Sequence, residues 1–190
     1  MDREVITKLD AARRQLKLAI RLYFDDGDLV ATHTRACAAR EIFEKHCKMD
    51  QRHRMFDEVR RRHPDATEKE LWEVLNRARN FFKHPDQNGN LDATIELGHD
   101  DNKMTIFMAA YDCASLLDMD APKIFMRYIT WFVGTEPFYR QHLPELDTHF
   151  PGLDSVDAET QWAIGKIFVK LATPDGRKIS VPEGWAVDAE

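Results

Sequence analysis

The sequence predicts an all-α fold, and three observations favour it. Glycine and proline number only 8 each among 190 residues, which leaves long stretches without a helix breaker. Apolar residues recur every three or four positions through most of these stretches, which is the spacing of one helix face. Capping residues stand where the stretches begin and end. A hydrophobic fraction of 43%, with 11 Phe and 4 Trp, indicates a chain that folds around a core.

The predicted bundle opens with a long antiparallel helical hairpin. Residues 25–28 form the turn between its helices, and Asp28 can cap the second helix, over residues 29–47. That helix is rich in alanine, which permits close packing against a neighbour. The first helix, over residues 3–24, has apolar positions at helical spacing: Val5, Leu9, Ala12, Leu16, Ala19 and Tyr23.

A third helix is predicted over residues 51–62 and a fourth from Thr67 to His84. Glu70 lies three positions after Thr67, which is the spacing of a capping box. Pro85 disfavours the helical conformation at His84 and stops the helix there. The apolar stripe of the fourth helix consists of Leu71, Val74, Leu75, Ala78 and Phe82.

The rest of the chain alternates helices with irregular segments. We expect a brief extended segment at 91–98, helices at 101–119, 122–134 and 158–171, and an irregular segment at 135–157, with a tail to the end. We assign residues 1–134 to one helical bundle. Residues 135–190 form a C-terminal extension, with one further helix packed on the same domain and a tail.

Charge is distributed unevenly along the chain. Residues 1–90 hold 19 Lys and Arg against 16 Asp and Glu, a net charge of +3, whereas residues 91–190 hold 8 against 17, a net charge of −9. A surface that binds a polyanion would therefore belong to the first half. The sequence has no apolar run of membrane-spanning length, and no apolar leader is expected at its start. With three cysteines read as reduced thiols, we expect a cytoplasmic protein that binds no membrane.

Two polar clusters are weak candidates for a site. His142, Glu145 and His149 have a spacing that resembles a metal site, but Pro144 breaks the helix that would align them, so neither a metal nor another cofactor is predicted. The second cluster is basic and either forms a solvated face near a helix C-terminus or contacts an RNA backbone. Its residues are Arg60, Arg61, Arg62 and, further along, Lys83.

The stretch RNFFKHPD, residues 79–86, carries the stronger candidate. Cleavage of RNA without a metal needs proton transfer at two oxygens and neutralisation of charge on the phosphate. Histidine side chains titrate in the right range for such proton transfer, and arginine side chains have donors that match phosphate oxygens. The stretch supplies one of each, His84 and Arg79. Five positions apart on a helix, the two side chains point about 140° away from each other. A twofold dimer would bring two such helix ends into one cleft, where Asn80 could orient either residue.

A structural role explains the same residues. Arg79 would then pair with Glu73, Asp86 or the acidic second half of the chain, while His84 would cap the last carbonyl groups of the helix. The residue types do not choose between a structural and a catalytic role.

RNFFKH resembles the Arg-x4–6-His motif of HEPN (higher eukaryotes and prokaryotes nucleotide-binding) domains. The predicted setting is also similar, with an initial helical hairpin and the motif at the end of a later helix. The resemblance implies an HEPN-like homodimer with a composite active site at its interface. There Arg79 would stabilise the transition state, His84 would be the general acid or base and Asn80 the orienting residue.

The resemblance implies two functions from different classes. The first is a metal-independent endoribonuclease or an RNA- or nucleotide-binding protein, which in a toxin–antitoxin system would also bind an antitoxin-like protein. The second is a dimeric helical module without catalysis that binds a protein partner or a small ligand.

Overall fold

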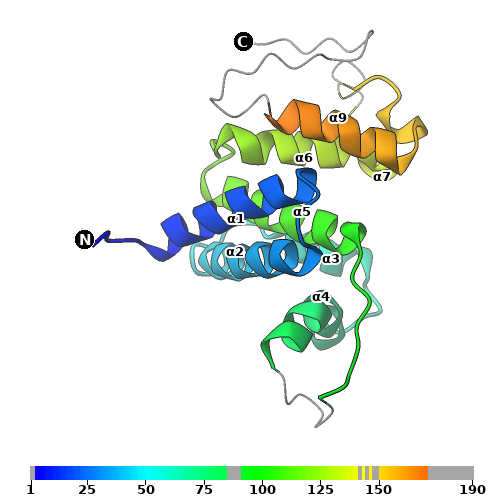
Figure 1. The fold of residues 1–190 in the computed structure, drawn as a ribbon. Helices are drawn as coiled ribbons and strands as arrows, with labels where there is room; N and C mark the ends of the chain where they lie inside the picture. Colours follow the sequence, from blue (N-terminus) through cyan, green and yellow to red (C-terminus); the bar gives the residue numbers. More distant parts are fainter. Residues whose placement is uncertain (1–2, 85–90, 141–142, 144–145, 147–149, 171–190) are drawn as a thin grey trace. The chain divides into compact units, whose positions relative to one another are not determined.

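The chain folds into helices, and the connection between α4 (Glu68–Lys83) and α5 (His99–Leu116) is a long one (Figure 1). The computed structural model describes residues 3–84, 91–140, 143, 146 and 150–170, and no strand occurs among them. The all-α class is therefore confirmed for this part of the chain. Two compact units are present, Met1–Met119 and Asp120–Glu190.

Helices α1 (Lys8–Phe24) and α2 (Leu29–Met49) pack against each other in the first unit. The carboxylate of Asp28 accepts a hydrogen bond from the Ala31 N–H at 2.7 Å, so the predicted cap of α2 is confirmed. Helix α1 begins five residues later than predicted, because Thr7 caps it. Val5 lies before that cap and is 96% exposed, so its assignment to the apolar face of the helix is wrong.

Helix α5 (His99–Leu116) completes the core of this unit by packing along α2. Near its start, Asn102 Oδ1 lies 3.0 Å from His33 Nδ1 of α2. Near its end, the carbonyl of Asp112 accepts a hydrogen bond from the Cys47 thiol of α2 at 3.3 Å. The two helices therefore run parallel. Their fully buried apolar residues include Ala36, Ala39, Phe43, Ile106, Phe107, Met108 and Ala110.

Helix α3 (Met55–Arg62) is held on the core through a buried carboxylate. The side chain of Asp112 is 1% exposed, and its Oδ1 accepts the Met55 N–H at 2.7 Å. Its Oδ2 has no hydrogen-bond partner in the described part of the chain. Burial raises the pKa of Asp112 to about 7. The helix starts later than the predicted residue 51, because Arg54 occupies the cap position and bonds the carboxylate of Asp57.

Helix α4 (Glu68–Lys83) begins at the predicted capping box of Thr67 and Glu70. Every residue of α4 is described and none is buried. Val74, a member of the predicted apolar stripe, is 73% exposed, so the stripe is not covered along its whole width. The helix packs on α2, which can cover only one side of it. The chain after it, over residues 91–98, forms no strand.

The second unit is built on α6 (Lys123–Thr135), whose main packing partner is α9 (Ala158–Lys170). Trp131 of α6 donates its indole N–H to the carbonyl of Gln161 at 2.8 Å. Two short helices, α7 (Pro137–Arg140) and η2 (Leu153–Ser155), also contact α6. They occupy part of the segment 135–157, which is predicted from sequence to be irregular.

The boundary between the two units falls after Met119, whereas the sequence-based division was placed after residue 134. Helix α6 accordingly belongs with the C-terminal elements that it contacts. Within the described segments, no helix combines the length and the apolar character that crossing a bilayer requires.

Candidate functional site

Helix α4 is attached to the rest of the first unit by one buried arginine and an aromatic stack. Arg40 of α2 is 2% exposed and donates to the side-chain oxygen of Asn76 and to the carbonyl of Leu75, the latter at 3.3 Å. Its guanidinium carbon lies 5.8 Å from the centre of the Trp72 ring. The Trp72 ring also stacks on Phe56 of α3, with centroids 4.0 Å apart and planes at 5°. These contacts fix the face that α4 turns toward α2.

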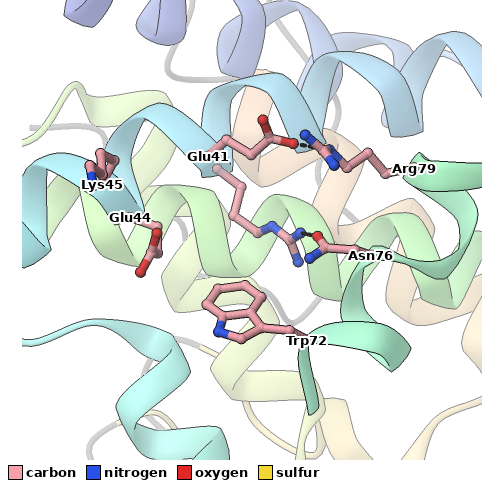
Figure 2. Close-up of a pocket in the computed structure, with 7 residues that line it drawn as sticks. Glu41, Glu44, Lys45, Trp72, Asn76 and Arg79 are labelled. Atoms are coloured by element: carbon pink, nitrogen blue, oxygen red, sulfur yellow. Dashed lines mark hydrogen bonds and ion pairs between the residues drawn. The ribbon is translucent and has the colours of Figure 1, made fainter. Parts of the chain in front are cut away.

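A groove of about 410 Å³ runs between α2 and α4, and Figure 2 shows the side chains that line it. We call it the α2–α4 groove. It contains three cations and two carboxylates beside the Trp72 ring, so it can hold a polar or anionic group but is not uniformly basic. Its lining residues are Arg40, Glu41, Glu44, Lys45, Trp72, Asn76 and Arg79.

Arg79 lies at one end of the α2–α4 groove, where Glu41 of α2 forms an ion pair with its Nε (Figure 2). Its Nη1 donates to Oδ1 of Asn80 at 2.8 Å. The Arg79 side chain is 23% exposed. A guanidinium has five N–H donors, so these two contacts leave capacity for a phosphate. In the structural role considered in the sequence analysis, Arg79 pairs with Glu73, Asp86 or the acidic second half of the chain. In the described residues the partner is Glu41 in the first half.

His84 ends α4 and is exposed. Its backbone N–H donates to the carbonyl of Asn80 at 3.0 Å, while its ψ of 87° has left the helical range. The predicted helix end is therefore confirmed. Among the described contacts Arg79 meets Asn80 but not His84, as their angular separation predicted. Pro85 and Asp86 lie outside the described residues.

The basic residues of α3 are engaged by nearby carboxylates. Arg61 and Arg62 both bond Glu58, at 2.7 and 2.6 Å, and Arg60 lies 3.8 Å from Glu68. Hydrogen bonds from the first two lower the pKa of Glu58 to about 2. These carboxylates therefore offset part of the positive charge of the cluster. Lys83 is exposed on the last turn of α4.

A buried histidine near the end of α4 was not identified from sequence. His33 of α2 is 3% exposed, and its Nε2 has no partner in the described part of the structure. The ring of Phe82 lies edge-on to it at 6.0 Å. Burial lowers the pKa of His33, because it disfavours the charged imidazole. Arg40 and Glu41 were also missed, because only the folded structure brings α2 beside α4.

No group of three or more potential metal ligands occurs within the described segments. The metal-like set His142, Glu145 and His149 lies outside them.

Comparisons with known proteins found no match to this chain. No protein-family model matches the chain, and neither does any curated protein or solved structure.

Proposed function

We propose that this protein is an HEPN-like, metal-independent endoribonuclease with a composite active site formed by two copies of α4. The observation that carries the proposal is the arrangement at the end of α4. An exposed imidazole stands at the helix exit, one turn beyond an arginine that is oriented on two sides.

Arg79 has the features of a residue that stabilises a transition state. Glu41 and Asn80 hold its guanidinium through Nε and Nη1, which reduces the side-chain freedom that would be lost on binding a phosphate. A preoriented guanidinium can donate two parallel hydrogen bonds to the oxygens of a pentacoordinate phosphate, where negative charge increases.

His84 has the access that proton transfer requires. Its side chain is exposed at the C-terminal end of α4, so it can reach a bound RNA. One His84 would remove the proton from the 2′-hydroxyl, and the His84 of the second copy would protonate the leaving 5′-oxygen. Both steps proceed without a metal ion.

A second copy is supported by the uncovered surface of α4. Leu71, Val74 and Ala78 lie at i, i+3 and i+7 on α4, and of these Val74 is largely exposed while Leu71 and Ala78 are half-buried. An apolar strip of this kind can pack against its own symmetry mate across a twofold axis. The pairing would place two copies of the Arg79–His84 turn in the same assembly.

Cleavage assays with single-stranded RNA in EDTA test the proposal. The wild type should cleave, whereas Arg79→Ala and His84→Ala should each lose activity by a factor of about 100 or more. His63→Ala is a closely matched control, because His63 also ends a helix, has a φ of −123° like His84 and precedes a proline. This control variant should cleave at the wild-type rate.

Two outcomes would refute the nuclease. One is cleavage that survives both substitutions, which would assign the activity to other residues or to a contaminant. The other is a wild-type protein that cleaves no RNA, structured or single-stranded. A sedimentation measurement that finds only the monomer at micromolar concentration would separately refute the composite site.

One observation favours a second candidate, a dimeric helical module without catalysis. The Arg79–Glu41 ion pair already gives the guanidinium a structural partner. A protein that dimerises but neither cleaves nor binds RNA would fit this function, with the apolar strip of α4 used for assembly.

A further inference from the structure

A second groove, of about 640 Å³, lies on another side of α4, between this helix and the chain that follows it. We call it the α4–loop groove. The helix contributes an acidic, a basic, an amide and an aromatic side chain, and residues 93–96 form the opposite wall. The full set is Glu73, Arg77, Asn80, Phe81, Ala93, Thr94, Ile95 and Glu96.

The α4–loop groove leads toward the proposed active site. Glu73, Arg77 and Asn80 follow one another at i, i+4 and i+7, so they form one stripe along the helix. His84 continues this stripe one turn after Asn80, to whose carbonyl its N–H is bonded. Asn80 also accepts a hydrogen bond from Arg79. A nucleotide in this groove would therefore lie beside Asn80, at the end of α4 that carries Arg79 and His84.

The chemistry of the groove suits a base better than a sugar–phosphate backbone. Arg77 contributes one positive charge, whereas Glu73 and Glu96 contribute two negative charges, so the lining would repel a run of phosphates. The ring of Phe81 is partly exposed and offers a stacking surface, as aromatic side chains do for unpaired RNA bases. The Oδ1 of Asn80 is engaged by Arg79, and its amide N–H groups remain to face an acceptor.

We infer that the α4–loop groove binds an unpaired guanine next to the cleaved phosphate, an inference that rests on the proposed function. Guanine alone among the four bases presents both O6 and N7 acceptors, which suit Arg77, and a donor amino group, which suits a carboxylate. Glu73 and Glu96 can only accept hydrogen bonds when ionised. Uracil lacks both N7 and the amino group, so it offers Arg77 no O6/N7 pair and keeps only its N3–H as a donor for a carboxylate.

Binding of RNA that cannot be cleaved separates this inference from catalysis. The probes are the labelled pentanucleotides UUGUU and UUUUU with 2′-fluoro sugars, which lack the attacking hydroxyl, and affinity is read by fluorescence anisotropy in EDTA. The wild type should bind UUGUU about tenfold more tightly than UUUUU. Phe81→Ala should weaken binding of UUGUU about tenfold. Glu96 is exposed, so Glu96→Gln should leave the fold intact and reduce the preference for guanine.

The matched control for Phe81→Ala is Phe138→Ala, because Phe138 is exposed and lines neither groove. Equal affinity for the two oligonucleotides, or no binding of either, would overturn the inference even if the protein cleaves RNA. Guanine-selective binding that Phe81→Ala and Glu96→Gln abolish, without any cleavage, would support the groove and refute the nuclease.

Discussion

Replacing Asp112 by asparagine should make the protein more stable at neutral pH and above, and the gain should depend on pH. The carboxylate of Asp112 is buried, and its pKa is raised from 3.8 to about 7. The folded state therefore binds a proton more tightly than the unfolded state. The contribution of this group to stability is highest below pH 4, falls as the pH rises from about 4 to 7, and is constant above that range. The asparagine side chain keeps an oxygen for the Met55 N–H and carries no charge to bury.

The size of the effect follows from the pKa difference. About three pKa units at 1.36 kcal/mol per unit correspond to about 4 kcal/mol between pH 4 and pH 8. In the Asp112→Asn variant the buried amide nitrogen lacks a partner where Oδ2 stands, which subtracts a constant cost of about 1–3 kcal/mol at every pH. The variant is therefore expected to be less stable than the wild type at pH 4 and more stable at pH 8.

Urea unfolding of the wild type and Asp112→Asn between pH 4 and pH 8 measures this difference. Carboxylates that titrate equally in both proteins cancel when their free energies of unfolding are subtracted. The exposed Asp65→Asn serves as the control and should show no pH-dependent difference. A difference between Asp112→Asn and the wild type that stays constant across the range would refute the argument that a charge is buried at this position.

Three further predictions concern the site and the core. Glu41→Gln should lower the rate of RNA cleavage about tenfold with little change in KM, because Arg79 loses the ion pair that orients it. An unchanged rate would exclude a role of Glu41 in positioning Arg79. Trp72→Ala should destabilise the first unit by about 2–3 kcal/mol, because it removes the stack on Phe56 and the contact with Arg40. Urea unfolding measures this loss, and a change below about 0.5 kcal/mol would contradict the proposed attachment of α4 through Trp72. The three cysteines are buried, and their pKa values are raised to about 11 to 12. At pH 8 they should therefore react with a thiol reagent only after the protein unfolds. Rapid labelling of the native protein would refute their burial.

Local features of the fold could be predicted from sequence. The cap at Asp28 and the capping box of Thr67 and Glu70 depend on residues three positions apart, so their chemistry is readable in a short stretch. The exit of α4 at His84 follows from the proline after it. These signals placed the helix that carries the candidate site.

Contacts between distant segments could not be predicted in the same way. Arg40 meets Asn76 across 36 positions, and Met55 meets Asp112 across 57. The alanine-rich sequence around Arg40 contains no sign that its guanidinium is buried. Apolar periodicity also indicates that a helix face is apolar but not that a neighbouring element covers it. This is why Val74 belongs to an apolar stripe and is nevertheless exposed.

In the candidate site, too, local features could be predicted from sequence and contacts between distant segments could not. The sequence identified Arg79, Asn80 and His84 as polar groups at one helix end, and their angular separation on α4 follows from helix geometry alone. The partner of Arg79 depends on how α4 lies on α2, so Glu41 could be found only in the folded structure.

A subunit-mixing experiment tests the composite site most directly. Wild-type protein is mixed with His84→Ala in varied proportions at constant total protein, subunits are allowed to exchange, and RNA cleavage in EDTA is measured. If two copies of His84 act in one cleft, mixed dimers are inactive and total activity falls with the square of the wild-type fraction. Activity that falls only in proportion to the wild-type fraction would show that each copy acts alone and would contradict a shared site.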